Sequence, residues 1–509
     1  MADLDLLVLG SGVAGLSAAV RAAEIHGMRV GVLTKAELQQ ATTRWAQGGV
    51  AAVLSEDPDS TDLHLADTLA AGAGLCDVDA VRVLVDEGPS RVHELIALGA
   101  AFDRDPQGRL ELAREGGHSV PRIVHAGGAA TGAEIERTLV DAVRSEVSAV
   151  YESSFALDLL VEGGRCRGVL AADPSGQRTE VRATHVLVAT GGYGQLFAVT
   201  TNPTEATGDG VAMAIRAGVA VADVEFEQFH PTALHHPVMP RPLLTEALRG
   251  HGALLRDRSG ERFVDELLSR DKVSRAITAR MIEQGVEHLW LDATGLDGFA
   301  DRFPTIMAEL TKVGLDPARD WLPIAPAAHY SCGGIVADLD GASSLPGLWV
   351  AGEASCNGVM GANRLASNSL LDGMVFGPRV VEAIDRGVDG PHATGAMRSV
   401  LGGGEIGGRR LTLPPQDATA IASREALQRT MTANAGVLRS AVSLGEAAAA
   451  CAGEVEGDDL GSWELRNLAT VGRLLCVAAL AREESRGAHT RTDFDATRED
   501  LRLRLIAGG

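Results

Sequence analysis

Lysine is scarce in this chain of 509 residues: its 46 basic residues are almost all arginine, and lysine occurs only at Lys35, Lys272 and Lys312. With 68 acidic residues, the formal net charge is −22. Binding to nucleic-acid phosphates needs a basic face, so this composition excludes a nucleic-acid partner. A local cluster of arginine and histidine can still bind an anion, because salt screens the global charge over roughly 8 Å.

Long apolar runs and paired cysteines are also missing. No uninterrupted apolar stretch approaches the ~18 residues of a membrane span, and the chain begins with acidic residues where a secretory signal is basic. The six cysteines show no C-x-x-C spacing, which disfavours a zinc site and a disulfide framework. The adjacent His235 and His236 have no further ligands at metal spacing. We expect a cytoplasmic protein without a metal and without membrane contact.

The chain is too long for one hydrophobic core, since single cores stop growing at roughly 250 to 300 residues. With 45% hydrophobic and 22% charged residues, it has the composition of a globular protein. Glycine is abundant, at 60 residues, and lacks the three-residue period of collagen. We therefore expect two or three domains with many tight turns or close ligand approaches.

A β-α-β unit is predicted at the start of the chain. Apolar strands at 4–9 and 28–33 flank a helical pattern at 16–26. The turn between the first strand and the helix is the dinucleotide fingerprint, whose glycines allow a tight turn, close approach of the pyrophosphate, and close packing of helix on strand. We assign the pyrophosphate site to Gly10, Ser11, Gly12, Val13, Ala14 and Gly15.

The second strand departs from the usual fingerprint. It ends at Thr34 and Lys35, where an acidic residue usually contacts the ribose hydroxyls, and Glu37 lies just beyond. The ribose contact is therefore assigned to Thr34 or Lys35.

The rest of the chain divides into further units. Apolar strands ending in glycine are predicted at 185–189 and 348–351, as expected where strands of an open α/β sheet meet a ligand. Helical patterns are predicted at 269–284, 303–313, 418–450 and 460–482. We predict an α/β fold with four parts: a discontinuous Rossmann-like domain at 1–224 and 331–395, an inserted α+β capping and substrate domain at 225–330, a Gly- and Pro-rich linker at 396–415, and a C-terminal helical bundle at 416–509.

Motifs along the whole chain resemble those of one flavoprotein family. Besides residues 10–15 they are Ala46-Gln47-Gly48-Gly49, Ala189-Thr190-Gly191-Gly192, Thr207-Gly208-Asp209-Gly210, Gln228-Phe229-His230-Pro231-Thr232, His329-Tyr330 before Cys332-Gly333-Gly334, Ala351-Gly352-Glu353 and the run from Gly361 to Leu370. They resemble the family of succinate dehydrogenase, fumarate reductase and L-aspartate oxidase flavoproteins. This resemblance implies FAD as the cofactor. Besides residues 10–15, it implies FAD contacts from Lys35, Thr42, Thr43, Gln47, Gly48, Gly49, Asp209, Glu353, Ser369 and Leu370.

Two positions distinguish branches of that family. Members in membrane complexes attach FAD covalently through a histidine five residues before the glutamine of A-Q-G-G, and Thr42 stands there in this chain. The resemblance therefore implies non-covalent FAD. Glu115 stands where the dehydrogenases generally carry an apolar residue, and in the oxidase branch this glutamate is associated with the substrate's ammonium group. A carboxylate disfavours a plain dicarboxylate ligand but suits one that also carries an amine.

For the substrate, the resemblance implies a set of charged and donor side chains: His230, Thr245, Glu246, Arg249, Arg275, His329 and Arg364. Arg364 would bind one carboxylate with His329 beside it, while His230 and Thr245 hold the other. Arg275 resembles the family arginine that donates a proton in fumarate reduction, with a relay through Glu246 and Arg249.

Three functions compete at this stage. The leading hypothesis is FAD-dependent oxidation of L-aspartate to iminoaspartate with O2 or fumarate as acceptor, the first step of NAD biosynthesis from aspartate. The second is a fumarate reductase or succinate dehydrogenase flavoprotein subunit with an iron-sulfur partner, against which Thr42 and Glu115 argue. The third is a flavin-binding scaffold without turnover. The sequence leaves open whether the protein is a monomer or homodimer, which acceptor it uses, what accepts the proton, how the capping domain moves, and whether a quinolinate synthase takes the imine.

Overall fold

The computed structural model describes residues 4–55, 57–417 and 420–509. The first two residues of the helical pattern predicted for 418–450 and the first three of the predicted N-terminal domain lie outside the described residues.

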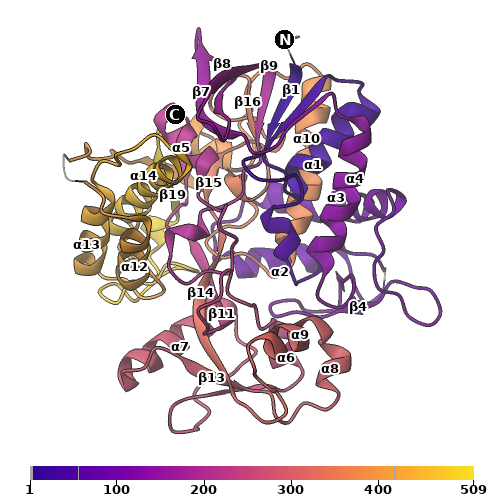
Figure 1. Cartoon of the computed structure of the whole chain (residues 1–509), viewed down its shortest axis with the longest axis vertical. Coiled ribbons are helices and arrows are strands. Elements are labelled where there is room, and N and C mark those ends of the chain that lie inside the picture. Colours follow the sequence, from indigo (N-terminus) through magenta and orange to yellow (C-terminus); the bar gives the residue numbers. More distant parts are fainter. Residues whose placement is uncertain (1–3, 56, 418–419) are drawn as a thin grey trace.

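A seven-stranded sheet forms the centre of the molecule (Figure 1). Its order is β6-β2-β1-β9-β8-β7, with β16 also beside β9, and five of its strands run parallel while β7, β8 and β9 pair antiparallel. The strands are β1 (Leu4–Leu9), β2 (Val30–Leu33), β6 (Ala149–Tyr151), β7 (Phe155–Glu162), β8 (Arg165–Ala172), β9 (Arg178–Val188) and β16 (Leu348–Val350). The predicted α/β class is confirmed.

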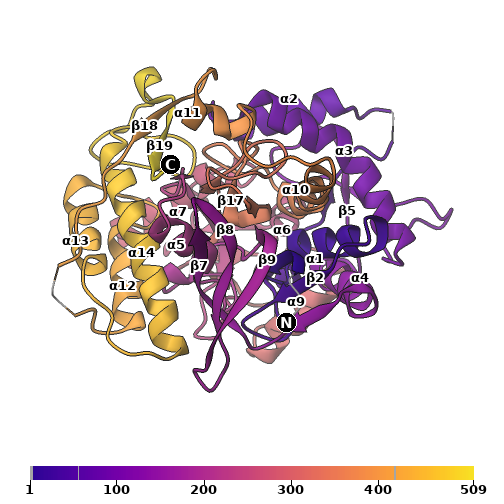
Figure 2. The ribbon, with the colours of Figure 1, turned by 90° about the horizontal axis from the view of Figure 1, so that it is seen from above.

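Both faces of this sheet are covered, which explains the uninterrupted apolar runs of its parallel strands. Side chains alternate along β1: Leu6 and Val8 pack in the core shared with α1 and α10, whereas Leu7 and Leu9 pack in the core shared with α5 and α14. Figure 2 shows α1, α3, α4 and α10 on one flank and the C-terminal helices on the other. These helices are α1 (Val13–Val20), α3 (Val78–Ala97), α4 (Thr131–Glu146), α5 (Asp209–Arg216), α10 (Asn368–Asp385) and α14 (Leu460–Ala481), and α2 (Thr61–Ala71) packs on α3.

The predicted turn and helix after β1 are present. Gly10 has φ +105°, and a Cβ at this position would lie 2.3 Å from the carbonyl oxygen of Ala189, so only glycine fits. The helix begins at Val13 and continues beyond Val20 as a π-helical turn, Arg21–Ile25. The first helix-strand unit is therefore formed as the glycine pattern predicts.

A second unit lies below the sheet in Figure 1 and has its own hydrophobic core. Its antiparallel sheet has the order β11-β14-β13-β12, and four helices pack with it. These elements are β11 (Glu227–Leu234), β12 (Leu254–Arg256), β13 (Leu289–Asp292), β14 (Leu322–Ser331), α6 (Glu246–Gly250), α7 (Arg270–Gln284), α8 (Phe299–Arg302) and α9 (Pro304–Lys312). Their composition matches the predicted α+β insertion.

The C-terminal region contains the predicted helices and, in addition, one strand inside the predicted linker and one strand near the end of the chain. Helices α12 (Arg424–Asn434), α13 (Ala441–Cys451) and α14 (Leu460–Ala481) are followed by a final strand, β19 (Leu503–Ala507). This strand pairs with β18 (Gly407–Arg410), in the middle of the predicted linker, and with β10 (Val221–Ala222). Glycine-rich composition did not reveal β18, because its backbone bonds are made with a partner almost a hundred residues away. The five-stranded sheet is completed by β15 (Gly334–Val336) and β17 (Ser355–Cys356).

Three smaller observations complete the description of the fold. A three-stranded sheet, in the order β3-β5-β4, consists of β3 (Val50–Ala51), β4 (Leu112–Ala113) and β5 (Ile123–Val124). Across the part of the chain that the structure describes, no helix combines the length and apolarity that membrane crossing demands. All six cysteines are buried and unpaired.

Candidate active site

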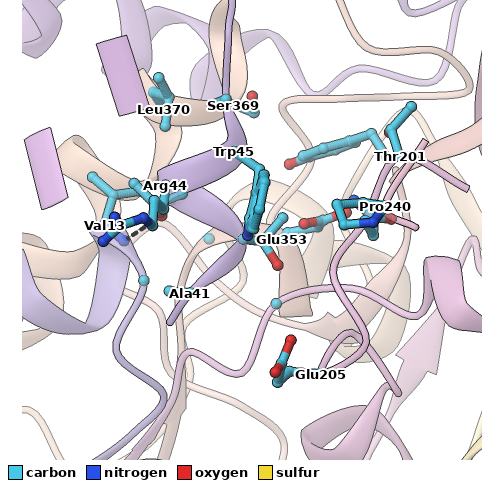
Figure 3. A pocket seen from close by; sticks show the side chains of 18 of the residues that line it. Val13, Ala41, Arg44, Trp45, Thr201, Glu205, Pro240, Glu353, Ser369 and Leu370 are labelled. Carbon is cyan, nitrogen blue, oxygen red and sulfur yellow. Dashed lines mark hydrogen bonds between the residues drawn. The ribbon is translucent and has the colours of Figure 1, made fainter. Parts of the chain in front are cut away.

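A cavity of about 620 Å³ opens at the carboxyl ends of the parallel strands and continues to the second unit. This is the place where open α/β sheets bind ligands. Figure 3 looks into it, with Val13 and Leu370 on one side of the view and Thr201 and Pro240 on the other. The predicted site residues that line it are Gly10, Ser11, Gly12, Val13, Ala14, Lys35, Thr42, Thr43, Gln47, Gly48, Gly49, Glu115, Asp209, His230, Thr245, His329, Glu353, Arg364, Ser369 and Leu370.

Four predicted residues do not line the cavity: Gly15, Glu246, Arg249 and Arg275. Gly15 packs behind the turn, where a Cβ would lie 2.3 Å from the carbonyl oxygen of Gly10. Its role is close packing, as the fingerprint requires. The other three belong to the substrate end and are described below.

Two helix N-termini face the dinucleotide end of the cavity. Helix α1 begins at Val13, whose backbone N–H donates to the hydroxyl of Thr43 at 2.9 Å, and α10 brings Ser369 and Leu370 to the wall. Helix N-termini favour negative charge. Gln47 adds a buried side-chain oxygen, Oε1, that has no hydrogen-bond partner within the described chain. The helix N-termini suit the phosphates of a ligand, and the Gln47 oxygen suits an N–H or O–H donor of the same ligand.

Lys35 has a larger structural role than the sequence suggested. Its Nζ lies 2.6 Å from the Thr207 hydroxyl, 2.8 Å from Asp209 and 2.7 Å from Glu464 of α14. Burial lowers the pKa of Lys35, but the two carboxylates outweigh it and raise the pKa. Lys35 therefore links β2 to the C-terminal helices while it lines the cavity. Thr34 lines the cavity as well, so a ribose contact from Thr34 or Lys35 stays a prediction.

At the substrate end, Arg364 is a buried guanidinium without a carboxylate at ion-pair distance in the described chain. Its Nη2 donates to Gln228 Oε1 at 3.0 Å, and its guanidinium lies 4.7 Å from the ring centroid of Tyr330. Its Nε is buried and unpartnered. Burial, followed by the charge of Arg270, lowers the pKa of Arg364 to about 10. It remains protonated at neutral pH and is ready to bind an anion.

His230 and His329 form an edge-to-face pair with ring centroids 5.2 Å apart. Burial, followed by the positive charge of Arg270, holds the pKa of both far below the ordinary histidine value, so both rings are neutral at pH 7. His230 Nδ1 accepts from the Thr232 backbone N–H, which leaves the proton on Nε2, and Nε2 has no partner among the described residues. His329 Nδ1 lies 2.8 Å from the Thr201 hydroxyl. His230 thus offers a free N–H donor to the cavity.

The structure corrects the position predicted for Arg275. On α7, Arg275 bonds to Asp271 and lies outside the cavity wall, whereas Arg270, the first residue of that helix, lines the cavity. Five residues correspond to about 140° around an α-helix, so the two side chains leave it on different faces. Arg270 therefore lies at the wall where Arg275 was predicted.

Glu246 and Arg249 lie behind Arg270 instead of on the wall. Arg270 Nε donates to Glu246 Oε2 at 2.9 Å, and Arg249 Nη2 lies 3.6 Å from Glu246 Oε1. All three come from the first turns of α6 and α7. Burial lowers the pKa of Arg249. Arg270, Glu246 and Arg249 thus form a connected row of side chains behind the cavity wall, and a proton relay through Glu246 and Arg249 stays a prediction.

Among the predicted substrate residues, Glu115 is the carboxylate that lines the cavity. Its carboxylate accepts from the Ser367 hydroxyl at 2.6 Å and lies 3.4 Å from Nε2 of His125. Burial raises its pKa, but His125, Ser367 and Arg270 outweigh burial and lower the pKa to about 2. Glu115 is therefore ionised.

Five residues at the substrate end had no role predicted from the sequence: Arg270, Gln228, Thr201, His125 and Ser367.

Comparison with known proteins identifies the family. The FAD binding domain family matches residues 5–370, and the Fumarate reductase flavoprotein C-term family matches residues 458–504. An L-aspartate oxidase of Streptomyces coelicolor is 47% identical over 98% of this chain and 90% of its own length, and one of Mycobacterium tuberculosis is 44% identical over 99% and 95%. The chain belongs to the L-aspartate oxidase family of FAD-binding flavoproteins.

Solved structures agree with this membership. The quinol fumarate reductase flavoprotein of E. coli is 29% identical with a TM-score of 0.84 over 98% of this chain and 93% of its own. Mycobacterium smegmatis Sdh1 is 32% identical with a TM-score of 0.82 over 100% and 92%. The L-aspartate oxidase family therefore shares its fold with fumarate reductases.

FAD is the cofactor of this L-aspartate oxidase family member. The cavity fits it, because two helix N-termini, a glycine turn without room for side chains and the unpartnered Gln47 Oε1 line the wall. Thr42 has no nitrogen through which the family's histidine-type covalent bond could form. FAD is accordingly held without that bond.

Proposed function

We propose that the protein oxidises L-aspartate to iminoaspartate, with bound FAD as the cofactor and O2 or fumarate as the electron acceptor. The observation that carries this proposal is the composition of the substrate end. Arg270, Arg364, His230 and His329 face the same cavity as the ionised Glu115. An amino dicarboxylate presents two negative groups and one positive group, and this wall complements all three.

The two arginines bind the carboxylates. Gln228 Oε1 accepts from Arg364 Nη2 at 3.0 Å and from Arg270 Nη1 at 3.4 Å, so one amide orients both guanidinium groups. Their mutual repulsion contributes to the lowered pKa of Arg364, and a bound dicarboxylate relieves it. His230 adds its unpartnered Nε2–H, and Thr245 adds a hydroxyl. Binding by both ends holds Cα in one position and excludes water.

In the reaction, the ammonium group of L-aspartate loses a proton to water, and the resulting amine loses a hydride from Cα to give the protonated form of iminoaspartate. Bound FAD supplies the two-electron acceptor for the hydride. Arginine is a poor base, so we assign charge stabilisation to Arg270 during amine oxidation. When fumarate is the acceptor, Arg270 also supplies a proton that is replaced through Glu246 and Arg249.

We further propose a cytoplasmic location and consumption of the imine by a quinolinate synthase. Six buried and unpaired cysteines fit a reducing compartment. Iminoaspartate hydrolyses in water, which favours an enzyme that consumes it promptly.

Anaerobic mixing with L-aspartate, succinate and L-malate tests the proposal. We expect L-aspartate alone to bleach the flavin absorbance rapidly, and readmitted O2 or added fumarate to restore it. Bleaching by succinate instead would favour the second candidate, a fumarate reductase or succinate dehydrogenase flavoprotein, which the fold similarity supports. Absence of bleaching by all three would favour a scaffold without turnover.

A further inference from the structure

The side chain that faces Glu115 has no role in the reaction described above. His125 follows β5, the central strand of the three-stranded sheet, and its Nε2 lies 3.4 Å from Glu115 Oε1. The side chain of Glu115 is 5% exposed and that of His125 is 19% exposed. A Cβ on Gly48 would lie 3.6 Å from the same Oε1, so this oxygen also faces the cavity wall. One carboxylate oxygen is thus shared between His125 and the cavity.

The other charged or titratable groups near Glu115 have bonding partners of their own. Arg270 bonds to Glu246, which lies so close to the loop that a Cβ on Gly116 would be 1.9 Å from Glu246 Oε1. His118 places Nε2 2.9 Å from the Ala366 carbonyl oxygen and Nδ1 2.8 Å from Arg122. Glu246 repels the charge of Glu115, and Arg270 attracts it from a distance. In the described chain, His125 is the titratable group at ion-pair distance from Glu115.

A buried carboxylate without such a partner takes up a proton. Protonated Glu115 would no longer attract an ammonium group, and it would no longer repel a plain dicarboxylate. We propose that His125 is a specificity-determining residue: by donating to Glu115 it keeps that carboxylate ionised and so directs the site toward amino dicarboxylates and against succinate, malate and fumarate. This inference rests on the proposed function, because it concerns the same substrate end. His125 acts through Glu115 and is a positioning residue.

The variants His125→Leu and His125→Gln test this inference in the FAD-loaded enzyme. His125→Leu removes the donor, and we expect kcat/KM for L-aspartate to fall at least tenfold at pH 7, the size expected for one hydrogen bond to a charged group. The dissociation constant for succinate, measured from the shift of the flavin spectrum, should stay unchanged or fall. His125→Gln keeps an N–H donor and should restore most of the selectivity. His93→Gln, at an exposed histidine of α3, is the matched control and should match wild type.

The pH profile gives a second readout. Glu115 must be ionised to bind the ammonium group, so activity is lost as pH falls through its pKa. With that pKa at about 2 in the native protein, Glu115 does not limit activity near neutrality. In His125→Leu the pKa rises, and the acid limb of kcat/KM for L-aspartate should move to higher pH. A Glu115→Gln variant should have no such limb, and adding His125→Leu to it should change selectivity little.

Three results would overturn the inference. His125→Leu could weaken L-aspartate and succinate by the same factor, it could match wild type, or it could act equally strongly in the Glu115→Gln background. If His125→Leu fails to bind FAD or to fold, the comparison of His125→Gln with His125→Asn decides the same question. If wild type binds both ligands without oxidising L-aspartate, the proposed function fails, and the two dissociation constants still test His125. If wild type binds neither ligand, both proposals fail.

Discussion

Arg364 and Thr245 mark the two extremes of what a single side chain contributes to this site. Arg364 is buried and carries a charge, and a bound carboxylate would be its ionic partner. Loss of one member of a buried ion pair costs about 3 to 5 kcal/mol. Loss of a hydroxyl hydrogen bond costs about 1 kcal/mol.

We therefore expect Arg364→Leu to lower kcat/KM for L-aspartate at least ~100-fold and Thr245→Val less than ~10-fold. Steady-state kinetics of both variants, with FAD content matched to wild type, provides the measurement. The reverse order of effects would contradict the assignment of Arg364 to a substrate carboxylate.

The two arginines of α7 give a paired prediction, because both carry the same charge on the same helix. Arg270→Gln removes a cavity-lining cation and the outer member of the Glu246 chain, and should reduce kcat/KM by ~100-fold or more. Arg275→Gln removes a partly exposed i,i+4 pair with Asp271 and should leave activity within ~3-fold of wild type. A larger loss in Arg275→Gln than in Arg270→Gln would return the catalytic role to the residue first predicted from the sequence.

At the scale of elements, the turn between β1 and α1 positions the dinucleotide end of the cavity. Gly10 and Gly99 have nearly equal φ angles, +105° and +103°, but differ in surroundings. A Cβ on Gly10 would collide with the Ala189 carbonyl oxygen, whereas nothing lies within 4 Å of one on Gly99. Comparing alanine substitutions at Gly10 and Gly99 therefore separates the cost of backbone strain, which both share, from the cost of a steric clash, which only Gly10 has.

Gly99→Ala should cost about 1 to 2 kcal/mol of unfolding free energy and leave FAD affinity unchanged. Gly10→Ala should cost more and weaken FAD binding at least ~10-fold, because β1 or its neighbour must move at the phosphate site. Fluorescence titration of the apoprotein with FAD and urea unfolding provide the two numbers. Equal effects of the two variants would show that strain, not the missing space, makes Gly10 necessary.

The helices and strands also differ in how well the sequence predicts them. Strands β1, β2 and β16 and helices α7, α9 and α14 lie close to their predicted ranges, since the hydrophobic pattern of each depends on its own residues. Strand β18 was predicted as linker because Gly407–Arg410 has neither apolar alternation nor β-branched residues. It is a strand only because β19 supplies its hydrogen-bonding partner.

At the scale of the whole molecule, buried ion pairs tie the C-terminus to the nucleotide-binding part. Arg504 of β19 pairs with Asp77, at the start of α3, and with Asp223, after β10. All three groups are buried. The last strand of the chain is thus anchored to segments that lie near its beginning and its middle.

Arg504→Met would leave two buried carboxylates without their cation. We expect a loss of about 3 to 5 kcal/mol in unfolding free energy. Arg498→Met, which removes an exposed pair with Asp500, should change it by less than ~1 kcal/mol. Thermal or urea unfolding of the holoenzyme measures both, and similar small effects in the two variants would show that β19 is not anchored through Arg504.

The sequence alone determined the fold class, the dinucleotide turn, FAD and the family, because these depend on local patterns and on motifs that keep their order along the chain. It also identified most of the residues assigned to the cavity, but Gly15, Glu246, Arg249 and Arg275 lie off its wall, and the lining residues Arg270, Thr201 and Ser367 had no predicted role. Choosing Arg270 over Arg275 required knowing which face of α7 meets the cavity. Pairing His125 with Glu115, and β18 with β19, likewise required three dimensions. Tertiary structure decided these points, because each depends on which parts of the chain pack together. The positions of residues along the sequence do not show this.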